Sequence, residues 1–315
     1  MRKSHHISAV GMTELSLAQI AVSLNIVISK FLLPSIPLLL LIDLRYIIAT
    51  IIAITFCFIA KSPIRISTPS HKSATNKDIA IICVQALCAG FLFNLLMLHG
   101  LNHSKAINAG VILSILPAAI ALLSFIFLKE HLNKAIMIAI VLAIIGAVIV
   151  NVGELSSFSL DHSIMGTLFL TASVIPEALF TVIAKWHNCT IRPVTMTVYA
   201  TAINAIAFTP LAIPYWLKFD FSSLTFFHGL LLVIYAFTSS IMFILWYRGI
   251  KKVSANIAGL FTTVMPISTV ILSFIFLKEN IDIFQFSGMV IIIVSIIIGT
   301  QAQHKKKDMV ILNTE

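Results

Sequence analysis

A few charged side chains lie inside long apolar runs of this sequence, and they are its best candidates for chemistry. Glu177 stands in the run LTASVIPEALFTVIAKW, residues 170–186, away from either end of the run. A carboxylate in such a run is costly and usually faces a cavity or a charged partner. We therefore expect Glu177 to bind a proton or a cationic group. The alternative is a structural ion pair with a buried Lys or Arg.

A second group of candidates lies near the facing ends of the first two apolar runs: Lys30, Asp43, Arg45 and Tyr46. Arg45 could hold a carboxylate or phosphate of a substrate, because its planar guanidinium matches such groups. Tyr46 could assist at the substrate or at a gate. Asp43 and Arg45 are two residues apart, so on a helix they point in different directions and should serve different partners. Lys30 could instead extend its ammonium group to the membrane surface.

Uncharged polar residues inside the runs are a weaker tier, because hydrogen bonds between helices explain most of them. Tyr235 and Ser239 are four residues apart and so share one helical face. We keep as candidates for the lining of a cavity Asn94, Asn204, Tyr235 and Ser239.

Three prolines inside the runs, Pro117, Pro176 and Pro266, are candidate hinges. Proline has no N–H, so the carbonyl four residues earlier loses its helical partner. In a membrane such a break survives only where neighbours or cavity water satisfy the freed carbonyl. The alternative for each proline is a static kink that serves packing alone.

The composition requires these residues to lie in membrane helices. Of 315 residues, 59% are hydrophobic and only 10% are charged, with a mean hydropathy of +1.04. A membrane span needs about 20 mostly apolar residues. We expect an all-α integral membrane protein with ten such helices, near residues 14–33, 38–60, 79–99, 106–127, 135–151, 164–185, 194–216, 226–247, 255–276 and 284–301.

Lysine and arginine predict the orientation, since they accumulate on the cytoplasmic side. With the N-terminus inside, the loops expected outside hold only Lys105, Lys218 and Lys278. This predicts an inner-membrane protein with both termini in the cytoplasm. It also explains the net charge of +9 without nucleic acid. The four cysteines lack the spacing of a metal site, and we expect no metal or cofactor.

The heptapeptide SFIFLKE occurs twice, at residues 124–130 and 273–279. It divides the chain into two five-helix copies, residues 14–151 and 164–301, joined by a linker at 152–163 and flanked by tails at 1–13 and 302–315. Five is odd, so the second copy should enter the membrane upside down. Inverted repeats are typical of secondary transporters, whose site lies between the copies near the midplane. Glu177 in the second copy corresponds to Val22 in the first copy.

Two further interpretations follow from residues at the helix ends. Glu130 and Glu279 should close turns by accepting hydrogen bonds from the exposed N–H groups of the following helix. The aromatic residues at helix ends should form a belt at the membrane surface and not a site: Trp186, Tyr215, Trp216, Trp246 and Tyr247.

The segments ILPAAIALLSFIFLKEHL, residues 115–132, and VMPISTVILSFIFLKENI, residues 264–281, show a family pattern. Together with Lys30 and the Arg45-Tyr46 pair, the chain resembles the EamA-type branch of the drug/metabolite transporter superfamily. It departs from that pattern at Lys129 and Lys278, where the family often has glycine. The resemblance implies a ten-helix carrier of small metabolites, amino acids or drugs, often an exporter.

No phosphate-binding loop, metalloprotease motif or nucleophile elbow is present in the sequence, so we expect no enzyme. The leading hypothesis is a secondary active transporter that works by alternating access, with a small-molecule substrate, the lipid bilayer and protons as candidate partners. The chain would act as a monomer or a homodimer. One alternative is an importer or exchanger of phosphorylated or nucleotide-like metabolites. A more remote one is an intramembrane enzyme or receptor.

Overall fold

The computed structural model describes residues 9–62, 76–103, 112–130, 132–152, 164–187, 191–278 and 280–312, and these residues form helices and connectors without any strand. The helices are α1 (Ala9–Leu32), α2 (Leu38–Ile59), α3 (Asn76–Ala86), η1 (Leu87–Leu92), α4 (Phe93–Asn102), α6 (Leu116–Leu128), α7 (Lys134–Val152), α8 (Ile164–Trp186), α9 (Pro193–Lys218), η3 (Phe221–Ser223), α10 (Phe226–Gly249), α11 (Ala255–Phe261), α12 (Val264–Leu272), η4 (Ser273–Leu277) and α13 (Ile283–Leu312).

Within this part of the chain, eight helical stretches are long and apolar enough to cross a membrane. Two shorter apolar helices, Leu116–Leu128 and Lys134–Val150, stand where the fourth and fifth spans are expected. The protein is therefore an all-helical, multi-pass membrane protein. Helix α13 continues to Leu312, so most of the tail expected at 302–315 is helical.

The repeated heptapeptide marks the ends of two helices. Lys129 and Lys278 have φ values of 53° and 59°, in the left-handed region that usually ends a helix with glycine. The predicted turn is therefore confirmed at Lys129 in the first copy and at Lys278 in the second. Glu279, the last residue of the second heptapeptide, lies outside the described residues.

The partner of Glu130 differs from the prediction. Its carboxylate accepts hydrogen bonds from the backbone N–H groups of Ala255 (3.0 Å) and Asn256 (3.2 Å), at the start of α11. The expected partner was the following helix, α7. Glu130 does cap a helix N-terminus, but it does so across 125 residues of chain.

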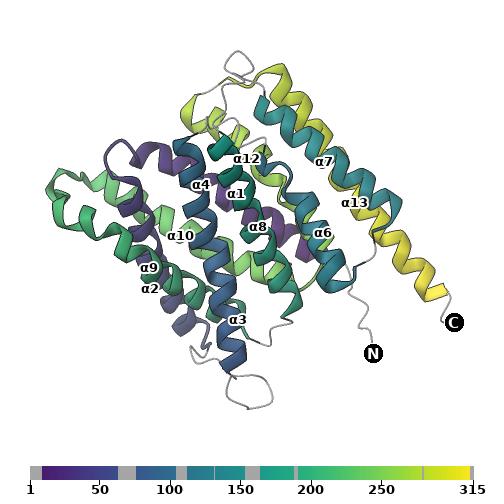
Figure 1. Ribbon diagram of the computed structural model, residues 1–315, viewed down its shortest axis with the longest axis horizontal. Helices are drawn as coiled ribbons and strands as arrows, with labels where there is room; N and C mark the ends of the chain where they lie inside the picture. Colours follow the sequence, from purple (N-terminus) through teal and green to yellow (C-terminus); the bar gives the residue numbers. More distant parts are fainter. Residues whose placement is uncertain are drawn as a thin grey trace.

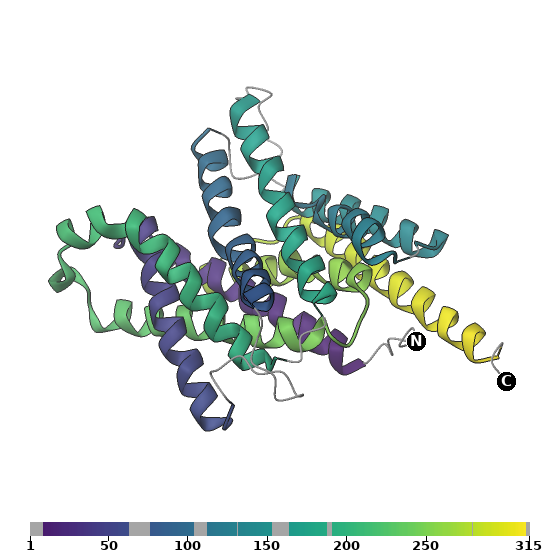
Figure 2. The same ribbon diagram turned by 60° about the horizontal axis from the view of Figure 1, so that its bottom comes forward.

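The helices pack in a regular set of pairs (Figures 1 and 2). Helix α1 packs against α10 and α12, and α8 packs against α4 and α6. The pairs α2–α9 and α7–α13 each join one helix from either half of the chain. The last pair crosses at Gly146 and Gly288, where a Cβ on Gly288 would lie 2.6 Å from the Gly146 carbonyl oxygen. Small residues at such a crossing let two membrane helices approach closely.

Two contacts repeat between the halves. A Cβ on Gly249 would lie 2.8 Å from Cγ of Leu15, and a Cβ on Gly100 would lie 2.6 Å from Cγ of Leu170. The two glycines match in the repeat, and so do the two leucines when the segments ISKF (28–31) and IAKW (183–186) are aligned. Helix α1 thus approaches α10 as α8 approaches α4.

The predicted aromatic belt is only partly correct. Trp186 is 56% exposed and Tyr215 is 40% exposed, as a belt requires. Trp246 and Tyr247 are buried, at 2% and 3% exposed, in a cluster of aromatic rings with Phe180. Phe180 of α8 contacts both rings, so packing covers these two side chains despite their place near a helix end.

Candidate functional site

A cavity of about 660 Å³ lies between the helices. At one end of the bundle, its lining includes Lys30 near the end of α1, Leu101 near the end of α4 and Gln285 near the start of α13. Deeper in the bundle, the lining ends at a floor that includes Phe180 and Trp246. Its lining on α1 begins at Gln19 and does not reach the first turns of that helix. The cavity therefore approaches one end of the bundle and is closed towards the other.

Most of the predicted site residues line this cavity: Glu177, Arg45, Tyr46, Lys30, Tyr235, Ser239 and Asn94, with Pro117 and Pro266. Two predicted residues do not. Asn204 is fully buried in α9, where its amide donates to the carbonyls of Ala86 (2.9 Å) and Ala200 (2.8 Å). Pro176 is buried in α8 and is not among the residues that line the cavity. Asn204 therefore lies outside the cavity lining, and its amide joins α9 to α3.

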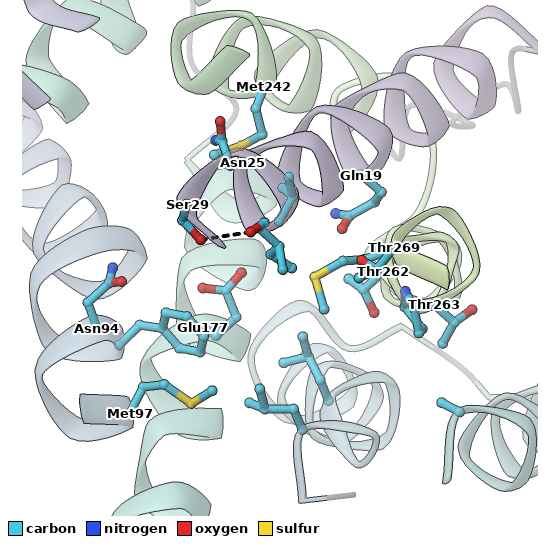
Figure 3. A pocket seen from close by; sticks show the side chains of 18 of the residues that line it. Gln19, Asn25, Ser29, Asn94, Met97, Glu177, Met242, Thr262, Thr263 and Thr269 are labelled. Atoms are coloured by element: carbon cyan, nitrogen blue, oxygen red, sulfur yellow. Dashed lines mark hydrogen bonds between the residues drawn. The ribbon is translucent and has the colours of Figure 1, made fainter. Parts of the chain in front are cut away.

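Glu177 presents its carboxylate to the space between α1, α4 and α12 (Figure 3). Ser29, on α1, lies on the facing side and donates its hydroxyl to the carbonyl of Ile26 (2.7 Å), whereas Asn94, on α4, donates to Gly90 (2.6 Å). None of the ion pairs found among the described residues involves Glu177. The structure thus shows no support for the structural ion pair that was its alternative role.

Arg45 is held by two tyrosines. Its guanidinium carbon lies 4.5 Å from the ring centre of Tyr46 and 5.1 Å from that of Tyr235, and its Nη1 donates to the Tyr235 hydroxyl at 3.2 Å. Aromatic faces attract a cation in this position. The Nε of Arg45 is buried, and none of the residues that the structure describes bonds to it. A positively charged group with an unused donor therefore lies beside the cavity.

Asp43 serves other partners, as its place two residues before Arg45 predicts. It is fully buried and accepts hydrogen bonds from the Thr209 hydroxyl (3.0 Å) and the Trp216 indole N–H (2.7 Å), both on α9. Asp43 thus fastens α2 to α9. The same bond makes Trp216 a packing residue in addition to its predicted place in the belt.

A network of hydrogen bonds ties α1 to the two helices beside it. Asn25 donates to the Ser239 hydroxyl (3.0 Å) and accepts from the Thr238 hydroxyl, both on α10. Ser23 donates to the carbonyl of Met265 (2.9 Å) and accepts from the Thr269 hydroxyl (3.1 Å), both in α12. Ser239 thus has a packing contact in addition to its place in the cavity lining.

Both copies of the repeat interrupt a helix beside the cavity. The chain turns at Thr262–Thr263 between α11 and α12, three residues before Pro266, and it turns at Ser114–Ile115 before Pro117. Thr262, Thr263 and Ser114 line the cavity. Interrupted helices place polar backbone and hydroxyl groups at the depth where membrane carriers bind their ligands.

Several lining residues were missed by the sequence reasoning: Gln19, Ser29, Met97, Met242, Trp246, Thr262, Thr263 and Thr269. On α1 a signal existed, because Gln19, Val22, Ile26 and Ser29 follow the spacing of one helical face. The methionines and Trp246 carry no such signal, since apolar residues occur on every face of a membrane helix.

Known proteins are similar to this chain over most of its length. The model of the EamA-like transporter family matches residues 10–152 and again residues 164–300. The uncharacterized transporter YetK of Bacillus subtilis (strain 168) is 31% identical over 296 residues, which cover 93% of this chain and 87% of that protein. An uncharacterized transporter in the trpA 3′ region of Buchnera aphidicola subsp. Schlechtendalia chinensis is 27% identical and covers 84% of each chain. A solved crystal structure at 14% identity has the same fold, with a TM-score of 0.76 over 95% of this chain and 99% of that chain.

Proposed function

Because this chain belongs to the EamA-like transporter family, we propose that it is a secondary carrier that moves a small metabolite through the cavity around Glu177. Its relatives are transporters and not enzymes. The observation that carries the proposal is the Glu177 carboxylate, which forms no ion pair within the described part of the chain and lies in a cavity whose lining ends at Trp246. A cavity closed at one end is what alternating access requires of each resting state.

The proposed architecture is ten spans in two inverted copies. The two separate family matches support it, as do the packing of Leu15 on Gly249 and of Leu170 on Gly100. The helix pairs support it too. In the repeat α1 corresponds to α8, α10 to α4 and α12 to α6, and the pairs α1–α10 and α1–α12 recur as α8–α4 and α8–α6.

The proposed location is the inner membrane with both termini in the cytoplasm, in line with the distribution of lysine and arginine. In that orientation the cavity reaches the outer end of the bundle, where Lys30 and Gln285 lie. We take export of an amino-acid-like or other amphipathic compound as the working direction.

The proposed roles follow the charges. Glu177 takes up a proton or the cationic group of a substrate, and Arg45 binds an anionic group with its unused donor. Tyr46 and Tyr235 keep the guanidinium in place. A second candidate function, exchange of phosphorylated metabolites, is favoured by the presence of both Arg45 and Lys30 in the same lining. Competition between phosphorylated and unphosphorylated forms of one ligand separates the two.

The test begins with a thermal-shift screen of metabolites on purified protein and continues with transport of each hit in reconstituted vesicles. Glu177→Gln keeps the shape and removes the charge, so transport should lose its dependence on pH while the protein remains folded. Asp220→Asn, at an exposed carboxylate outside the spans, is the matched control and should behave like the parent. Unchanged pH dependence in Glu177→Gln would remove Glu177 from coupling, and an absence of flux for every hit would contradict transport itself.

A further inference from the structure

The closed end of the cavity is bridged by side chains that reach from one group of helices to another. One group consists of α4, α6 and α8, and the second of α1, α10 and α12. Helix α11, which continues into α12, contacts α6 and α8 at the closed end. The contacts between the two groups are therefore the ones that must break if the cavity is to open at that end.

One of these contacts is made by Lys185 at the end of α8. Its Nζ donates to the carbonyl of Ile250 at 3.2 Å and to the carbonyl of Val253 at 2.5 Å. Both carbonyls belong to the connector between α10 and α11. A single lysine side chain thus bonds two carbonyls of the other helix group, at the buried residues Ile250 and Val253.

Two neighbours add to this bridge from the end of α6. The carboxylate of Glu130 accepts the N–H groups of Ala255 and Asn256, and the hydroxyl of Ser124 donates to Oδ1 of Asn256 at 2.6 Å. Ser124 is fully buried, so this bond is protected from water. All of these bonds end within residues 250–256.

An aromatic layer lies between this bridge and the cavity. Phe180 of α8 stacks on Trp246 of α10, with ring centres 6.2 Å apart, and meets Tyr247 edge-on at 5.9 Å. Phe180 and Trp246 line the cavity floor. Among the described residues, the buried indole N–H of Trp246 has no hydrogen-bond partner, so holding the ring here costs free energy.

The hydrogen bonds of α12 differ from those of residues 250–256. Among the described residues, its side-chain hydrogen bonds go to Ser23 of α1 or back to α12 itself, and none goes to α6 or α8. Among the described residues, the side-chain bonds that join this helix group to α6 and α8 thus end within residues 250–256, and those of α12 do not reach α6 or α8.

From this geometry we infer that Lys185, with Glu130 and Ser124, forms a releasable gate that seals the cavity below the Phe180–Trp246 layer. The inference rests on the proposed transport function, because only a carrier needs to open this end. Lys185 is a gating residue and does not contact the substrate, since the aromatic layer separates it from the cavity.

The test measures access to the cavity from each face of the membrane. In full-length protein with its four cysteines replaced by serine, Met242→Cys places a thiol in the lining. A membrane-impermeant maleimide is added to right-side-out and to inside-out vesicles, and the labelling rate is measured for each. The parent should react quickly from one face and slowly from the other.

Lys185→Met should raise the rate from the slow face by about tenfold or more, because the loss of even one bond from a charged donor shifts an equilibrium by about that factor. Lys185→Arg can still donate to both carbonyls and should keep the slow rate. Lys218→Met, at an exposed lysine at the end of α9, is the matched control and should equal the parent. If Lys185→Met does not fold, Ser124→Ala should raise the slow-face rate several-fold.

The possible failures are distinct. A slow-face rate that does not change in Lys185→Met or Ser124→Ala overturns the gate and leaves the proposed function standing. Equal rates from both faces in the parent also overturn the gate. A thiol at residue 242 that reacts from neither face contradicts the transport route itself.

Discussion

The crossing of α7 and α13 gives the sharpest prediction of stability. In Gly288→Ala the new Cβ would lie 2.6 Å from the Gly146 carbonyl oxygen and 2.7 Å from the backbone nitrogen of Val150. Both neighbours are backbone atoms of a helix, so they cannot rotate away and the two helices must separate. Overpacking of this kind costs about 1–3 kcal/mol. The expected result is a less stable protein of unchanged fold.

Gly229→Ala is the matched control, because no atom lies within 4 Å of a Cβ at that position in the first turn of α10. Both substitutions gain the same helix propensity, about 1 kcal/mol or less, so the difference between the variants isolates the clash. Thermal unfolding of the purified proteins in one detergent measures it, and Gly288→Ala should unfold several degrees below Gly229→Ala. Equal unfolding temperatures would refute the close crossing of α7 and α13.

Three further substitutions test single contacts. Glu130→Gln leaves one acceptor oxygen for two backbone N–H groups, so it should lower stability by about 1.5–3 kcal/mol in the same unfolding assay; an unchanged unfolding temperature would show that the cap contributes nothing. Arg45→Lys loses the planar stack on the tyrosines and should weaken binding of an anionic ligand about tenfold or more in a thermal-shift titration, with the ligand-free protein unchanged; equal affinity would exclude Arg45 from the site. Asp43→Ala leaves the N–H of the half-buried Trp216 unpaired and should cost about 1–3 kcal/mol, whereas a neutral result would mean that water replaces the carboxylate.

The sequence predicts the apolar helices well because length and hydropathy are local properties. The helix between 164 and 185 is expected from composition alone and is found as Ile164–Trp186. The place of Glu177 in a cavity is predictable for the same reason, since few positions inside a membrane tolerate an acid. The break near Pro266 is also predictable, although the turn itself begins at Thr262.

The contacts that depend on the other half of the chain are not predictable in this way. Asn204 faces α3 and Gly90 instead of the cavity because of how α9 lies against that segment. Trp246 stands at a helix end in the sequence, where exposure is expected. Its burial depends on the contact with Phe180 of α8, which the sequence does not reveal. Glu130 caps α11 instead of α7 because the repeat brings two distant helix ends together. In each case the side chain and its type are visible in the sequence, and its partner is not.

The two halves of the chain share their packing and differ in their charges. Leu15 and Leu170 occupy matching positions and make the same contact with matching glycines. Glu177 faces the cavity from the position that Val22 occupies in the first copy, and Val22 lines the same cavity as an apolar residue. In the proposed carrier the shared packing would let the frame open at either end, whereas Glu177 adds a carboxylate to the lining from the second copy alone. We therefore expect the exchange Glu177→Val to preserve the helix packing and abolish transport, while Val22→Ala should leave transport measurable.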